Sequence, residues 1–233
     1  QPRSRGLGDV YKRQLDITVT YSLTPDNGLV IDYEATTDAP TIVNPTSHVY
    51  YNLHGTTEHS TDSHLLTIHA SGFTPTDAGL IPTGEILPVE GTPLDFRTPH
   101  AIGERIGQTD YEPLAFGNGY DHNWALDKPE AGTVSLAAEA YEPATGIRMK
   151  IYADQPGLQF YAGQGMDGKE VGKRGDRHNF RSGIALETQN FPDAPNHDNF
   201  PSSVLRPGET YTQHTVYAFE TCLLYTSDAA DEL

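Results

Sequence analysis

The stretch SGIALETQNFPDAP, residues 182–195, runs from an apolar segment straight into a carboxylate and then into a turn. Ile184, Ala185 and Leu186 are typical of a buried strand. Glu187 follows without a break. A buried carboxylate is costly unless it is paired, neutralised or used chemically. The Pro, Asp and Asn residues that come next favour a turn, so we predict a buried strand that ends at a functional or paired glutamate.

Alternating runs separated by turn residues extend from this stretch over most of the chain. Two pairs of runs predict hairpins: 15–24 with 29–37 across PDNG, and 133–143 with 147–155 around ATGI. Further strands are predicted at 41–53, 64–70, 157–164 and 210–220, and the one short helix candidate is AIGERIGQ, 101–108. With 22 Gly and 17 Pro, the chain is typical of an all-β protein, a sandwich or barrel. We expect one domain, residues 15–221.

The charge of the chain limits its partners. The 233 residues carry a net charge of −17 at pH 7, and an acidic surface does not favour nucleic acid. No apolar run is long enough to span a membrane, so we expect no membrane partner. The single cysteine, Cys222, lies near the C-terminus. The rest of the chain has no thiol, which fits a reducing compartment, and we expect a cytoplasmic protein.

The two ends share a coding relationship. One DNA word encodes CLLYTS, residues 222–227, and its reverse complement in another frame encodes DVYKRQ, residues 9–14. That word is the transposon end used to tag sequencing libraries. We therefore predict that residues 1–14 and 222–233 are adapter-derived tails and leave them out of the fold.

Polar side chains gather on one face of several predicted strands, because successive side chains in a strand point to opposite faces. Amides and carboxylates beside aromatic rings suit a sugar, whose hydroxyls need hydrogen bonds and whose C–H faces pack on rings. The sets that share a face are His48 with Tyr50 and Asn52, Asp121 with Asn123, Gln159 with Tyr161, and Glu187 with Gln189.

Each of the main candidates also has a purely structural interpretation. The His48 imidazole could bond a nearby carbonyl, Asp121 could cap the turn of GNGYD, and Gln159 could bond the backbone of a neighbouring strand. Glu187 could pair with an arginine, at position 181 or 206. The residues alone leave these alternatives open.

Metal chemistry is not expected, although the chain has ten His. Neither HExxH nor CxxC occurs, and HGTTEHSTDSH, residues 54–64, has the composition of a polar loop. A serine nucleophile in a G-x-S-x-G motif is also missing from the sequence.

Five blocks, taken in order, resemble the aldose 1-epimerase (galactose mutarotase) family over residues 15–221. The resemblance implies a large antiparallel β-sandwich, the galactose mutarotase-like supersandwich. It implies interconversion of the α and β anomers of free aldoses such as glucose and galactose, without metal or organic cofactor. The blocks are NPTSHVYYNLHG (44–55), IPTGEILPVEGTPLDFR (81–97), NGYDHNWAL (118–126), DQPGLQFYAGQGMDG (154–168) and SGIALETQNFPDAPNHDNFPSSVLRPGETY (182–211).

The resemblance also implies residue roles. Glu187 corresponds to the catalytic base and His48 to the catalytic acid, with Tyr51 replacing the family's usual Phe. Asp121 and Gln159 correspond to residues that contact the sugar.

One departure stands out. The family carries an upstream segment with a sugar-binding Arg and an H-G-G histidine, and this sequence has no counterpart of it. We therefore expect the chain to be an N-terminally truncated part of a longer protein. Two alternatives remain open: a hexose-6-phosphate 1-epimerase, which needs clustered Arg or Lys near the pocket, and a non-catalytic sugar-binding β-sandwich. The 15 basic residues show no obvious grouping in the sequence.

Overall fold

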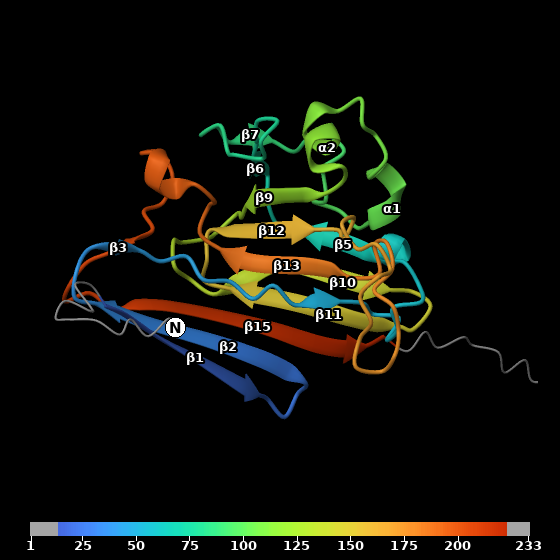
Figure 1. The fold of residues 1–233 in the computed structure, drawn as a ribbon, viewed down its shortest axis with the longest axis horizontal. Coiled ribbons are helices and arrows are strands. Elements are labelled where there is room, and N and C mark those ends of the chain that lie inside the picture. Colours follow the sequence, from blue (N-terminus) through green and yellow to red (C-terminus); the bar gives the residue numbers. More distant parts are fainter. Residues whose placement is uncertain (1–13, 223–233) are drawn as a thin grey trace, which may run out of the picture.

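Two antiparallel sheets make up most of the computed structural model, which describes residues 14–222 (Figure 1). The predicted tails fall almost entirely on residues 1–13 and 223–233, outside the described residues.

The larger sheet has seven strands. Their spatial order is β1 (Leu15–Leu23), β2 (Gly28–Thr37), β15 (Tyr211–Thr221), β11 (Ile147–Ala153), β10 (Ser135–Glu142), β5 (Leu65–Ile68) and β8 (His100–Ala101).

The second sheet has six strands and carries the candidate site. Their order is β4 (Tyr50–Tyr51), β13 (Ile184–Gln189), β12 (Gly157–Tyr161), β9 (Asp121–Ala125), β6 (Gly72–Thr74) and β7 (Leu87–Pro88). A small third sheet pairs β14 (Val204–Leu205) with β3 (Thr41–Ile42). The helices are short: η1 (Thr61–Ser63), α1 (Ile102–Arg105), α2 (Glu112–Gly117) and η2 (Ala194–Asn196).

The hydrophobic core lies between the two large sheets; in Figure 1, β12 and β13 of the six-stranded sheet overlap β5 and β10 of the seven-stranded sheet. Apolar residues at alternate positions of strands such as β2, β11 and β12 face inward, as packed antiparallel sheets require. Trp124 on β9 is fully buried, and its indole nitrogen donates to the carbonyl of Leu94 at 3.1 Å. Phe160 on β12 and Met149 on β11 are also fully buried and come from opposite sheets. The all-β sandwich prediction is therefore confirmed.

Both predicted hairpins form. Strand β1 pairs with β2 from Leu15↔Thr37 to Leu23↔Leu29, and β10 pairs with β11. The single strand predicted at 41–53 is wrong. Only Thr41–Ile42 and Tyr50–Tyr51 are strand there. Pro45 lies in the gap between them and has no N–H to give to a ladder.

The helix prediction is half right. The segment 101–108 contains α1, but α2 at Glu112–Gly117 was not predicted. Helix α2 has Pro113 in its first turn and is capped at its C-terminal end by Asn118, which adopts a left-handed backbone with φ 50°. Both are ordinary helix boundary signals, yet so short a helix has no apolar period to reveal it.

Strand β1 lies at an open edge of the seven-stranded sheet, at the lower side of Figure 1. Every residue of the strand is exposed, including the apolar series at alternate positions. The exposed fraction reaches 63% at Tyr21 and 83% at Leu23. Among residues 14–222, no segment fully covers the apolar side of β1, and exposed edge strands of this kind readily pair with other chains.

Within residues 14–222, no helix has both the length and the apolar character needed to cross a membrane.

Candidate functional site

A row of polar residues crosses the six-stranded sheet. Glu187 on β13 pairs with Gln159 on β12, which pairs with Asn123 on β9, which in turn pairs with Thr74 on β6. Directly paired residues of antiparallel strands have side chains on the same face. The four side chains therefore form one continuous line on the face opposite the hydrophobic core. Their spacing follows from the main-chain ladder.

A second row runs beside the first, two residues along each strand. It consists of Tyr50, Ala185, Tyr161 and Asp121, which are paired in that order across β4, β13, β12 and β9. The small side chain of Ala185 leaves the two tyrosine rings as neighbours, with centroids 6.2 Å apart. Between the rows, the Gln159 Nε2 donates to Oδ1 of Asp121 at 2.7 Å.

His48 and Glu187 meet at this face. The His48 Nε2 lies 3.4 Å from Oε1 of Glu187. The side chain of His48 is 48% exposed and that of Glu187 only 7%. The imidazole also packs at 4.9 Å between ring centroids on Tyr50, and at 6.2 Å on Tyr161. An accessible imidazole thus stands over a largely buried carboxylate.

Burial controls the protonation of the two carboxylates. Burial raises the pKa of Glu187; the nearby His48 opposes this rise and the charge of Asp121 adds to it. Burial likewise raises the pKa of Asp121, and the hydrogen bond from Gln159 opposes it. Both carboxyl groups are consequently better proton acceptors than an exposed glutamate or aspartate.

Side-chain clamps hold the irregular segment that carries His48. Asn44 and Asn190 exchange two hydrogen bonds: the Asn44 Nδ2 donates to the Asn190 carbonyl at 3.1 Å, and the Asn190 N–H donates to Oδ1 of Asn44 at 2.8 Å. Thr46 donates to the carbonyl of Thr188 at 3.2 Å. These bonds replace the ladder that Pro45 interrupts, and they fasten the segment to the end of β13.

Two cavities adjoin this face. The first, of about 190 Å³, is lined by Asp121, Gln159 and Asn123 together with Thr74 and Pro192. The second, of about 440 Å³, lies between Tyr50 and Tyr161 and the loop that follows β12, including Asp167, Glu170 and His178. Polar groups and rings of this kind suit a small polar ligand.

The structure brings together all four predicted site residues, His48, Asp121, Gln159 and Glu187. Two structural alternatives are not found. The charged partner of Glu187 is His48 and neither Arg181 nor Arg206; Arg181 pairs with Asp62 at 3.2 Å instead. Asp121 opens strand β9 and bonds Gln159 instead of capping its turn.

Other residues of the face were not among the predicted site residues. Tyr50, Tyr161 and Asn123 had the right strand parity, and this parity was the available signal. Thr74 carried no signal, since its place beside Asn123 depends on a pairing between strands distant in sequence.

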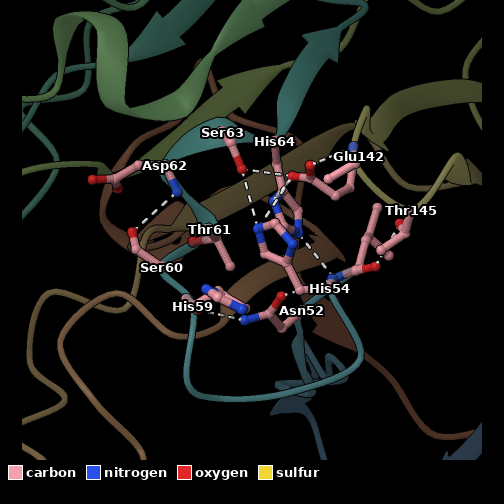
Figure 2. Close-up of polar contacts among 12 residues, drawn as sticks. Asn52, His54, His59, Ser60, Thr61, Asp62, Ser63, His64, Glu142 and Thr145 are labelled. Carbon is pink, nitrogen blue, oxygen red and sulfur yellow. Dashed lines mark hydrogen bonds and ion pairs between the residues drawn. The ribbon is translucent and has the colours of Figure 1, made fainter.

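The histidine-rich stretch 54–64 is not simply a polar loop, as its composition had suggested. His64 is fully buried, and its Nδ1 lies 3.0 Å from Oε2 of Glu142, which is also buried (Figure 2). His54 joins the same carboxylate, with its Nε2 3.3 Å from Oε2.

The amino-acid sequence of the chain matches a known family and its members. The family model described as aldose 1-epimerase matches residues 2–218. The galactose mutarotase of Homo sapiens is 40% identical over 210 residues, which are 90% of this chain and 58% of that protein. The aldose 1-epimerase of Escherichia coli (strain K12) is 38% identical over 208 residues, 88% of this chain and 58% of the relative. The chain thus spans about 58% of the length of these relatives.

Solved structures agree in fold. The aldose epimerase homologue from C. elegans superposes with a TM-score of 0.78 at 31% identity, covering 89% of this chain and 60% of that one. Galactose 1-epimerase from Lactobacillus acidophilus gives a TM-score of 0.75 at 25% identity, with coverage of 89% and 57%. Sequence match, sandwich fold and polar sheet face agree, and the chain belongs to the aldose 1-epimerase family.

Proposed function

We propose that the full-length protein is an aldose 1-epimerase that interconverts the α and β anomers of free hexoses such as glucose and galactose. The observation that carries this proposal is the contact between the Nε2 of His48 and the Oε1 of Glu187, 3.4 Å apart on the polar face of the six-stranded sheet. Family membership supports it. The proposal concerns the full-length protein because the chain spans only about 58% of its relatives.

The reaction needs a base and an acid at one carbon. The anomeric hydroxyl and the ring oxygen are both bonded to C1, so two groups a few ångströms apart reach both. The Glu187 carboxylate takes the proton of the anomeric hydroxyl while His48 gives a proton to the ring oxygen. The C1–O5 bond breaks, and an open-chain aldehyde with a free C5 hydroxyl forms.

Closure reverses these steps. The aldehyde group turns about the C1–C2 bond, so that the C5 hydroxyl can attack either face of the carbonyl. His48 takes back the proton from that hydroxyl, and protonated Glu187 returns its proton to the new anomeric oxygen. No net proton is consumed. The raised pKa of Glu187 suits a group that must both accept and return a proton.

Asp121 and Gln159 serve as sugar-binding residues in this proposal. Asp121 accepts hydrogen bonds from sugar hydroxyls, and Gln159 holds the Asp121 carboxylate by its 2.7 Å bond. Tyr50 and Tyr161 offer ring faces to the sugar's C–H groups. No metal or organic cofactor enters this scheme, because every proton moves between the sugar and the two side chains.

The cavity linings favour a free sugar over a phosphorylated one. Five of the basic residues do lie between positions 169 and 181, so the expectation of ungrouped basic residues is wrong for this segment. Among the residues described, however, neither cavity beside the site is lined by Lys or Arg, and the larger one presents Asp167 and Glu170. These carboxylates would repel a phosphate.

Polarimetry on the full-length protein tests the proposal. Fresh α-galactose or α-glucose should reach anomeric equilibrium faster with the protein than in buffer, and Glu187→Gln should lose most of this activity while the sugar still binds. Glu139→Gln, a carboxylate on β10 away from the site, is the matched control and should keep it. Sugar binding without any acceleration by the unmodified protein would instead indicate a non-catalytic sugar-binding module.

A further inference from the structure

The turn that follows β4 is held by side chains rather than by a ladder. Leu53, five positions after His48, donates its N–H to the Nε2 of His64 at 2.8 Å. Its carbonyl accepts a hydrogen bond from the Thr145 hydroxyl at 2.9 Å. Both backbone groups of this buried residue are therefore satisfied by side chains from other parts of the fold, as Figure 2 shows for His64 and Thr145.

Glu142 organises these contacts from the end of β10, in the opposite sheet. Its Oε2 accepts from the Ser63 hydroxyl at 2.6 Å and lies 3.0 Å from the Nδ1 of His64. Its Oε1 accepts from the N–H of Ala144 at 2.8 Å. Only 1% of Glu142 is exposed, so these groups take the place of water around the carboxylate.

The hydrogen bonds determine the protonation of the pair. Since the His64 Nε2 accepts the N–H of Leu53, the ring proton lies on Nδ1, which is 3.0 Å from the Oε2 of Glu142. Burial lowers the pKa of His64 to about 4, against the opposing charge of Glu142, so the ring is neutral. Burial tends to raise the pKa of Glu142, but the bonds from Ser63 and Ala144 prevail and lower it.

This protonation argues against a metal centre. The ligand atoms of His54, His64 and Glu142 lie within 4.8 Å of one another, a spacing that a divalent cation would accept. A metal needs a free lone pair on each imidazole. On His64, one nitrogen accepts the Leu53 N–H and the other carries the proton. His64 and Glu142 consequently form a relay of polar contacts that leads from β10 to Leu53.

The segment with His48 needs such an anchor. Strand β4 is two residues long and pairs with β13 only at Tyr51↔Ile184 and Tyr50↔Ala185. The clamps from Asn44 and Thr46 fix the segment before His48. The relay fixes the segment after His48 through Leu53, so that His48 is held from both sides.

We propose that Glu142 and His64 are positioning residues that act through Leu53 to hold His48 against Glu187. The inference rests on the proposed function for its kinetic consequence but not for its structural one. Neither residue touches the sugar in this scheme. Their effect is on the place of the His48 ring, and a misplacement of about 1 Å can cost about a hundredfold in rate.

The test uses full-length Glu142→Gln and Thr145→Val, with Glu139→Gln as the matched control. A glutamine at 142 brings an NH2 group among the donors of Ser63, His64 and Ala144, while valine at 145 removes the bond to the Leu53 carbonyl and keeps the side-chain shape. We expect kcat for mutarotation to fall about tenfold to a hundredfold in Glu142→Gln, and less in Thr145→Val, with KM changed by less than about threefold.

Each variant is also made in a His48→Ala background. If the relay acts through His48, Glu142→Gln causes no further loss there, because the group that it positions is already gone. The same fractional loss in both backgrounds would mean a general loss of folded protein and would overturn the proposal. So would unchanged kcat in Glu142→Gln.

NMR gives a readout independent of activity. In Glu142→Gln, the ring resonances of His48 and the amide of Leu53 should shift, whereas in Glu139→Gln they should not. Unshifted His48 resonances in a folded Glu142→Gln protein would refute the positioning role. If the unmodified protein proved inactive, the proposed function would fail while this measurement would still decide whether Glu142 and His64 place His48.

Discussion

Gln159 reaches across two paired strands to donate a 2.7 Å hydrogen bond to Oδ1 of Asp121. Gln159 also pairs in register with Glu187 on its other side. A single residue of β12 thereby connects the carboxylate proposed to bind the sugar with the strand that carries the proposed base. The bond orients Asp121 before a ligand arrives, which reduces the ordering that binding requires.

Removal of the Asp121 charge should weaken sugar binding. A hydrogen bond to a charged group contributes about 1.5–3 kcal/mol, so Asp121→Asn should raise KM about tenfold to a hundredfold. Gln159→Leu leaves the aspartate charge but releases its orientation, and a smaller increase is expected. Initial-rate polarimetry over a range of galactose concentrations measures both; equal KM values in all three proteins would remove Asp121 from the binding site.

The acid limb of the pH–rate profile should report Glu187. Its pKa is raised mainly by burial, so the carboxylate becomes protonated, and inactive as a base, at a higher pH than an ordinary glutamate. Activity should therefore fall on acidification before the usual range near 4.3 is reached.

The pH dependence of the residual activity of His48→Gln tests whether His48 lowers the pKa of Glu187. His48 lowers the pKa of Glu187, so its removal should move the acid limb to higher pH. A shift to lower pH would contradict the charge interaction between the two residues.

The proposed base should also reduce stability. Because the folded-state pKa of Glu187 is raised, the cost of ionisation grows as pH rises through that pKa and is absent well below it. Glu187→Gln avoids this cost. We expect the variant to melt above the unmodified protein at neutral pH, with the two curves converging near pH 4. Calorimetry at both pH values checks this, and a lower melting temperature of the variant at pH 7 would contradict it.

Substitutions at two neighbouring residues of β12 should differ in their effect on the free energy of unfolding. Phe160 is fully buried in the core, so Phe160→Ala should lower the free energy of unfolding by about 3–5 kcal/mol. Gln159, one position earlier, lies on the opposite face. Gln159→Ala should cost about 1 kcal/mol or less. Urea unfolding measures both, and similar losses would be inconsistent with the strand's two faces.

The open edge at β1 should promote self-association of the 233-residue chain. Val19 is 40% exposed in the middle of an apolar series on that strand. Val19→Lys introduces a charge there, which natural edge strands use against pairing. Dynamic light scattering should show fewer large species for the variant at equal concentration. Val134→Lys, the same substitution at a 51% exposed position away from β1, should not have this effect.

Local patterning was enough to predict β12 and β13, the strands that carry Gln159 and Glu187. The alternation in IALETQ and GLQFY predicted which side chains share a face, because the two-residue period of a strand is local. It could not predict which strands are neighbours. The row that joins Thr74 to Glu187 depends on pairings between β6, β9, β12 and β13, far apart in sequence.

The resemblance to a family supplied the roles of the residues, not their geometry. The buried relay of His64 and Glu142 could not be predicted from the sequence, for a specific reason. His54, His64 and Glu142 have the composition of a solvated loop and a strand end, and their burial arises only when the β10–β11 hairpin packs against the turn after β4. Tertiary contacts of this kind leave no periodic signal.

The line of paired residues from Glu187 to Thr74 has an evolutionary consequence. The backbone fixes the distance between successive residues of this line at about 4.8 Å, the spacing of neighbouring strands, whatever their side chains are. A substitution at one position can therefore exchange one contact with a ligand while its neighbours keep their places. Preference for one sugar over another can change in single steps on such a surface, without a redesign of the sheet that supports it.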